Sequence, residues 1–142
     1  MAKSEFAKVT GSAKKRLYGE RGALVCGYSV PDQDVLLAML ERWNFSEVPV
    51  VFATIDDAER PVGEVLREPA GHGRGRDSLL PRAIVLSGVS EKELNTIMAA
   101  WKHLGLPPQN WAALTPTSEA WTIMDLLAEL DMERIAMQGM RK

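Results

Sequence analysis

The sequence predicts an α/β protein in which tandem βαβα repeats form one four-strand domain with pseudo-twofold symmetry, with mostly parallel pairing within each repeat. Three observations support this fold class. Short apolar runs are typical of strands that are buried on both faces. Each run is followed by a stretch with apolar residues at helical spacing, which is typical of a helix packed on a sheet. The order of elements in residues 23–68 then recurs in residues 82–142.

The second repeat, residues 82–142, carries the clearer pattern. Residues 83–86 are apolar and partly β-branched, so they predict a buried strand. Ser90 with Glu93 three residues later forms a capping box, which predicts that a helix begins there. Gly105 supplies the end of that helix.

The rest of the second repeat continues with a strand and a helix. Residues 111–114 predict the strand, and Thr122 with Asp125 indicates the start of a last helix that we expect to run to about Gln138. Two strands separated by a helix of this length are normally parallel and joined by a right-handed crossover.

Two motifs in this repeat resemble a known family. They are Ser-Gly-Val-Ser-x-x-Glu-Leu at residues 87–94 and Leu-Thr-Pro-Thr-x-x-x-Trp-Thr at residues 114–122. The chain resembles, over residues 82–130, a bacterial uncharacterised family catalogued as domain of unknown function 3783. The resemblance implies a small α/β fold and brings no activity, cofactor or catalytic residue with it.

The first repeat, residues 23–68, has the same order of elements. Residues 23–26 and 50–55 predict its strands, and Pro31 and Pro61 suit the first turns of its two helices. When Gly27 is aligned with Gly88, its apolar positions stay in phase with those of the second repeat, with one gap near the first turn. One repeat alone buries little surface, so we expect the two to share one core as a single globular unit.

Two segments lie outside the repeats. Residues 1–22 contain six basic and two acidic residues, a net charge of +4, and predict a basic N-terminal arm. Residues 69–81 are rich in glycine and arginine and predict a flexible linker.

Composition excludes several classes of protein. The 142 residues are 46% hydrophobic and 25% charged, which is ordinary for a globular protein, and no apolar run has transmembrane length. The net charge of −2 disfavours a dedicated nucleic-acid binder. A single cysteine, Cys26, excludes an internal disulfide and, with no apolar signal core at the N-terminus, indicates a cytoplasmic protein without membrane attachment.

The candidate ligand-binding residues are Ser90, Thr115, Thr117, Trp121 and Ser29. They follow predicted strands, and the carboxyl ends of parallel strands meet at one edge, where free amides and helix dipoles favour an anion. The alternative interpretation is that Ser90 and Thr122 only cap helices and that Trp121 only packs.

No catalytic, metal or cofactor site is predicted. Cys26 lies within an apolar strand, where a thiol is inert. His72 and His103 have no second Cys or His at ligand spacing, and the glycine-rich segment lacks the ending of a phosphate-binding loop. We therefore expect no cofactor and favour a non-catalytic protein, with an enzyme left open as the alternative.

Three functional hypotheses remain. The first is a non-catalytic interaction or scaffold module that binds a protein partner or forms a homo-oligomer. The second is an anion- or nucleotide-binding domain that uses the strand carboxyl edge. The third is a weak nucleic-acid contact through the basic arm together with Arg74 and Arg76.

Overall fold

The computed structural model of the chain describes residues 15–140 and contains a mixed four-stranded sheet with strand order β2-β1-β3-β4. Strand β1 (Gly22–Cys26) is parallel to β2 (Val50–Ala53), and β3 (Ala83–Ser87) is parallel to β4 (Asn110–Ala113). The two central strands, β1 and β3, are antiparallel to each other. The predicted α/β class and the four strands are confirmed, but the sheet as a whole is mixed because its two halves run in opposite directions.

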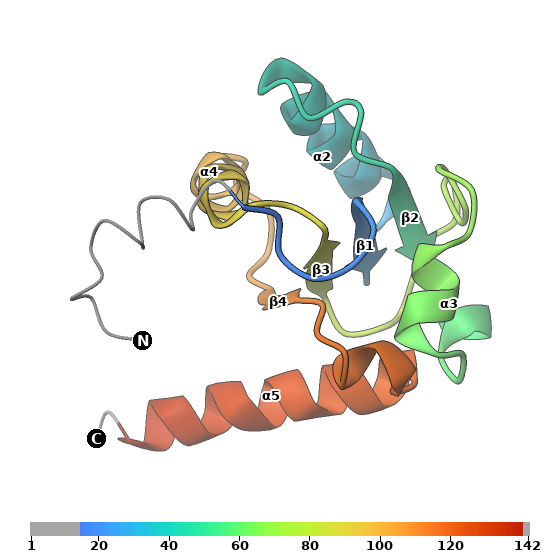
Figure 1. Cartoon of the computed structure of the whole chain (residues 1–142), viewed down its shortest axis with the longest axis vertical. Coiled ribbons are helices and arrows are strands. Elements are labelled where there is room, and N and C mark those ends of the chain that lie inside the picture. Colours follow the sequence, from blue (N-terminus) through green and yellow to red (C-terminus); the bar gives the residue numbers. More distant parts are fainter. Residues whose placement is uncertain (1–14, 141–142) are drawn as a thin grey trace.

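Helices cover both faces of this sheet, as Figure 1 shows. The helices are α2 (Val30–Arg42), α3 (Val62–Leu66), α4 (Glu91–Trp101) and α5 (Ile123–Met140), with two short 3-10 turns, η1 (Ile55–Asp57) and η2 (Ser118–Ala120). Helices α2 and α4 pack on one face, and α3 and α5 pack on the other. The protein therefore has three layers, helices on each side of a central sheet.

The core lies in two apolar clusters, one on each face of the sheet. Side chains alternate between them along each strand, so Val25 packs toward α2 and α4 while Leu24 packs toward α3 and α5. Strands β1 and β3 are buried along their whole length. This burial on both faces is what their continuous apolar sequence predicts.

Helix starts follow the local signals in the sequence. Ser29 caps α2 by accepting a hydrogen bond from the Asp32 amide, and Pro31 occupies its first turn. The Thr122 hydroxyl accepts a hydrogen bond from the Asp125 amide at the start of α5. These predicted starts are confirmed, and the predicted end of α5 near residue 138 falls two residues before its observed end.

Strand pairing in the two halves has matching register. Leu24 lies opposite Val51 in the first half, and Val85 lies opposite Ala112 in the second. At the constant offset of 61 residues that Gly27 and Gly88 define, Leu24 corresponds to Val85 and Val51 corresponds to Ala112. The strand register therefore matches without the gap of the sequence alignment, which placed residues 23–26 on residues 83–86. Leu24 and Val85 face each other across the centre of the sheet.

The segment predicted as a flexible linker, residues 69–81, is hydrogen-bonded along much of its length. Its backbone pairs with β2, since the Phe52 amide donates to the His72 carbonyl oxygen at 2.7 Å and the Gly71 amide donates to Val50 at 2.8 Å. Gly73 has φ +75°, and a Cβ at this position would overlap the Phe52 carbonyl oxygen. The segment thus covers the outer edge of β2, and glycine permits the close approach.

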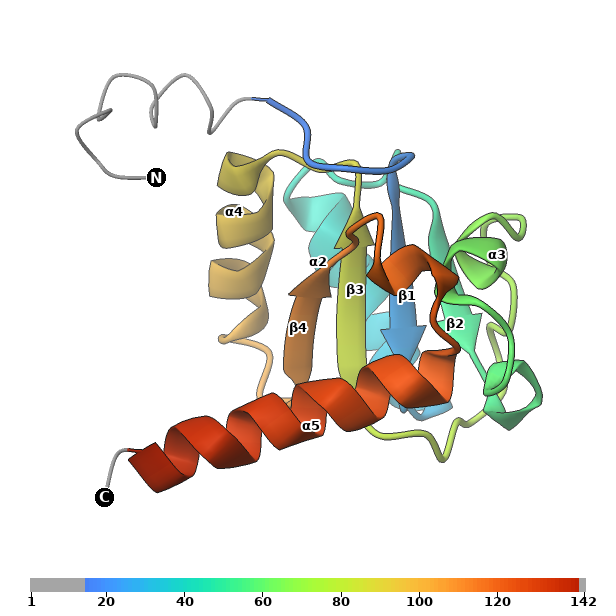
Figure 2. The ribbon, with the colours of Figure 1, turned by 60° about the horizontal axis from the view of Figure 1, so that its bottom comes forward.

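Helix α5 is longer than the sheet is wide. Figure 2 shows it crossing the sheet and continuing beyond β4. Every residue from 132 to 138 is exposed to solvent. Among the described helices, none is both long enough and apolar enough to cross a membrane.

Candidate functional site

The predicted ligand residue Ser90 lies at the N-terminus of α4, where it is already engaged. Its hydroxyl accepts a hydrogen bond from the Glu93 amide at 3.1 Å, and the Glu93 carboxylate accepts one from the Ser90 amide at 2.8 Å. Arg21 then donates to both oxygens of Glu93, at 2.9 and 2.8 Å. A carboxylate of the protein itself thus occupies the position where the helix dipole would favour an anion.

The other predicted residues at this edge belong to the turn after β4. The Thr115 and Ser118 hydroxyls lie 3.1 Å apart, and each accepts a hydrogen bond from the other residue's amide. Thr117 is exposed and makes no side-chain cap. Trp121 is half-buried against the core on the α3 and α5 face. Thr115 therefore stabilises the turn, and Trp121 packs against the core.

Ser29 does not join these residues. Because β1 and β3 are antiparallel, their carboxyl ends point in opposite directions along the strands. Ser29 and Ser90 therefore lie at opposite ends of the strands. The prediction that Ser29 and Ser90 share one edge is wrong. It assumed that the two halves run in the same direction, which local sequence patterns do not encode.

A cavity of about 500 Å³ lies near the edge that carries Ser90, but it is lined by different residues. Gly19, Gly63, Ser87 and Leu114 form part of its wall. The charged residues around it are two arginines and three glutamates: Arg21, Arg67, Glu20, Glu68 and Glu119. This balance does not favour an anionic ligand.

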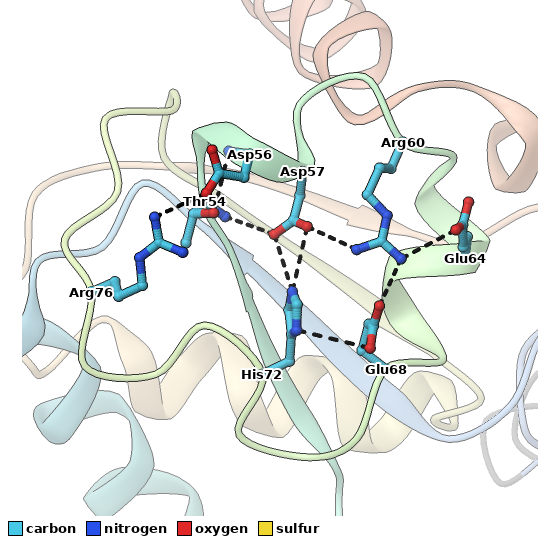
Figure 3. A network of polar contacts seen from close by, with 8 residues as sticks. All are labelled: Thr54, Asp56, Asp57, Arg60, Glu64, Glu68, His72 and Arg76. Atoms are coloured by element: carbon cyan, nitrogen blue, oxygen red, sulfur yellow. Dashed lines mark hydrogen bonds and ion pairs between the residues drawn. The ribbon is translucent and has the colours of Figure 1, made fainter.

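A network of polar contacts surrounds Asp57, just after β2 (Figure 3). The buried Asp57 carboxylate accepts hydrogen bonds from the Thr54 amide at 3.0 Å and from Arg60 at 2.9 Å, and His72 Nε2 lies 3.2 Å away. Burial alone would raise the pKa of Asp57, but the Thr54 amide, Arg60 and His72 outweigh it, so the pKa lies below its usual value.

Only part of this network has a signal in the sequence. Thr54 and Asp57 have the spacing of a capping box, and the structure contains one. The contact of Asp57 with His72 joins residues 15 positions apart, in a segment that was predicted to be flexible. Sequence spacing alone could not identify this pair.

An Asp–His pair can serve in proton transfer, but this arrangement favours a structural role. One ring nitrogen of His72 faces Asp57 and the other faces Glu68, whose carboxylate oxygen lies 3.9 Å from Nδ1. A general base needs a ring nitrogen directed toward the substrate. The network instead attaches residues 68–72 to the turn after β2.

The thiol of Cys26 is not accessible to a substrate. Cys26 is fully buried, and desolvation, followed by the nearby Asp57 charge, raises the pKa of its thiol to about 12. No three His, Cys, Asp or Glu side chains within residues 15–140 are placed to hold a metal ion.

One side of the molecule has a different character, and we call it the β4–α5 side. It consists of strand β4 (Asn110–Ala113) and the exposed apolar residues Met132, Ile135 and Met137 of α5. These three side chains are 57–65% exposed. A groove of about 250 Å³ between Trp111 and Met137 joins the two elements.

Fold and surface together define a three-layer α/β protein with an exposed apolar side. Comparison with protein families identifies residues 82–137 as a match to a family described as Domain of unknown function (DUF3783). The match contains β3, α4, β4 and α5 through Met137. Searches of curated proteins and of solved structures found no match.

Proposed function

We propose that this protein is a non-catalytic interaction module that binds a protein partner through its β4–α5 side. The observation that carries the proposal is the exposed end of α5. Residues 132–138 are exposed around the whole helix, yet three of them are large and apolar. A helix with apolar residues on all sides is normally covered, and two free turns contribute little stability alone.

The two edges of the sheet support the same proposal. Backbone groups of residues 71–72 cover the outer edge of β2, whereas β4 pairs only with β3 among the described residues. Open edge strands readily pair with another chain, and proteins usually protect them. An unprotected edge beside an apolar helix is typical of an interaction surface.

We also propose that the two halves are copies of one unit, as the recurring sequence pattern suggests. The matching register of Leu24–Val51 and Val85–Ala112 supports this. Residues 71–72, which follow the first copy, cover β2, whereas residues 132–133, which lie at the same offset of 61 in the second half, belong to α5. The difference between the copies thus coincides with the element that leaves β4 uncovered.

The alternative hypotheses receive less support from the geometry. The predicted residues Ser90 and Thr115 are engaged within the protein, as described above. Arg74 and Arg76 make ion pairs with Asp34 and Asp56, at 3.2 and 3.0 Å, so their charge is partly neutralised. The predicted basic arm falls largely on residues 1–14, outside the described residues.

The location proposed from the sequence is the cytoplasm. The free and buried thiol of Cys26 supports a reducing compartment. Fractionation of the cells that make the protein, with detection of the chain in each fraction, tests this location.

Photo-crosslinking in the same cells tests the interaction module. Ile135 is replaced by benzoylphenylalanine, and the same replacement at Glu59, an exposed residue near η1, is the control. We expect an adduct with one defined polypeptide at position 135 and none at position 59, with the polypeptide identified by mass spectrometry.

The same adduct should respond to the surface chemistry of α5. Met132→Glu should remove it, whereas Ala128→Glu, at an exposed position on the N-terminal half of the helix, should leave it intact. An absence of polypeptide adducts at position 135, or equal labelling at position 59, would contradict the proposed function. A crosslink to another copy of this chain counts as support here.

A further inference from the structure

We infer that the partner on the β4–α5 side is a second copy of this chain, whose β4 pairs antiparallel with the first across a twofold axis at Ala112. The inference rests on the proposed function, because it takes the β4–α5 side to be the interaction surface. It adds the identity of the partner and the register of the pairing. The two four-stranded sheets would then form one continuous sheet.

The backbone of β4 has the right pattern for this pairing. The Asn110 amide donates to the Arg82 carbonyl oxygen, and the Leu114 amide donates to the Leu86 carbonyl oxygen. The backbone amide and carbonyl groups of the even-numbered residues of β4 therefore point toward β3. In a parallel pair the alternate residues point away, which directs the amide and carbonyl groups of Trp111 and Ala113 outward.

Those two residues can form a complete set of hydrogen bonds with a second copy. When Ala112 lies opposite Ala112 of the second copy, Trp111 lies opposite its Ala113. Hydrogen-bonded pairs alternate with non-bonded pairs in an antiparallel ladder, so both Trp111–Ala113 pairs fall at bonded positions. The Ala112 pair at the axis falls at a non-bonded position, where the strands' side chains are closest.

The side chains of β4 are compatible with themselves in this register. Trp111 packs on the α4 face, where its ring lies edge-on to Trp101 with centroids 5.6 Å apart. Ala113 lies on the same face. Each Trp111 would therefore have the small side chain of Ala113 from the other copy beside it. Asn110–Ala113 contains no charged residue and no proline, the usual protection of an edge strand.

The end of α5 requires a partner broader than a single peptide strand. It projects past β4 on the face that carries α3 and α5, so it would extend over the same face of the second copy, which that copy's own α3 and α5 also cover (Figure 2). Met132, Ile135 and Met137 would be covered there. A stable interface buries about 800 Å² on each partner, which a four-residue strand cannot supply without the helix.

Light scattering after size exclusion, over a wide range of protein concentration, measures the assembly. We expect a dimer for the native chain. Ala113→Pro removes an outward amide while leaving the pairing with β3, and should weaken the dimer at least about tenfold. Ala113→Ser keeps the amide and should remain dimeric.

A second pair of variants tests the contribution of α5 to the dimer. Ile135→Glu should weaken the dimer by a similar factor, because it would place a charge in the interface. Ala128→Glu adds the same charge to an exposed position closer to the start of α5 and should not. Circular dichroism confirms that each variant is folded.

A cysteine crosslink tests the register and does not depend on a destabilised variant. Cβ atoms of facing non-bonded residues lie about 4.5 Å apart, close enough for a disulfide after small adjustment, so Ala112→Cys should form covalent dimers on mild oxidation. Asn110→Cys is the control, since two copies of residue 110 would be about 13 Å apart. Native Cys26 is buried and does not compete.

The outcomes separate this inference from the proposed function. A native chain that stays monomeric overturns the dimer, as does a dimer that persists in Ala113→Pro and Ile135→Glu. If position 135 still crosslinks to a different polypeptide, the interaction module stands with another partner. If position 135 crosslinks to nothing and the chain is monomeric, both fail.

Discussion

Glu93 shows how one side chain combines a helix cap with an ion pair. It completes the capping box of α4 and binds Arg21, which attaches the segment before β1 to the start of α4. The Arg21 hydrogen bonds, which outweigh desolvation, and the Ser90 amide lower the pKa of Glu93 to about 2. The capping box was predicted from sequence, but Arg21 lies 72 residues away and was not.

We predict that Glu93→Gln separates the two roles, because glutamine can still accept the Ser90 amide but cannot pair with Arg21. The variant should be less stable at pH 7 by about 1 kcal/mol, as expected of a partly exposed ion pair. Urea unfolding measures the difference.

The pH dependence follows from the direction of the shift. The folded pKa of Glu93 lies below its unfolded value of about 4.3, so the ionised carboxylate stabilises the fold fully above that pH. The contribution is lost as the pH falls toward 2. If the difference in free energy of unfolding between the native protein and Glu93→Gln stayed constant from pH 7 to pH 2, the Glu93 carboxylate would not be the stabilising group.

At the scale of elements, residues 69–81 show where sequence and structure differ most. The buried side chain of Gln33 in α2 holds this segment. Its Nε2 donates to the Arg76 carbonyl oxygen at 2.8 Å, and its Oε1 accepts from the Gly75 amide at 2.9 Å. The segment that was predicted to be flexible is thus bound through its backbone by a side chain that is distant in the sequence.

We predict that Gln33→Ala releases the segment and exposes it to protease. Trypsin should cleave after Arg74 and Arg76 slowly in the native protein and at least several-fold faster in the variant, because cleavage requires local opening. Mass spectrometry locates the cuts. Asp34→Ala is the control, since it removes only an exposed ion pair with Arg74 and should change the rate little.

The elements themselves were predicted well. Each strand and helix is encoded locally, by an apolar run or by periodicity with a cap, and their order agrees with the structure. The antiparallel join of β1 and β3 was not predicted, because it depends on how the chain returns through residues 69–81. That single error placed Ser29 at the wrong edge of the sheet.

At the scale of the whole molecule, the central pairing of β1 with β3 joins the two halves into one core. β3 is buried on both faces and pairs with β1 over five residues. The family match of residues 82–137 contains β3 but not β1. That segment alone would expose the β1-facing edge of a strand whose sequence is wholly apolar up to Ser87.

We predict that the fragment 82–142 does not form a stable monomer. Circular dichroism and light scattering should show an unfolded or self-associated species, and addition of the fragment 1–81 should restore the spectrum of the intact protein. A monomeric fragment with cooperative thermal unfolding would show that the second half is an independent domain.

The cover that residues 71–72 place over β2 has a consequence for assembly size. Lateral addition of strands can propagate without limit only when each new subunit offers a fresh edge. Here each subunit has one covered edge strand, β2, and one open edge strand, β4. When two β4 strands pair, no open edge strand is left for a third subunit. Strand addition through β4 would therefore terminate at a pair, and a fibril built by repeating that contact is geometrically excluded.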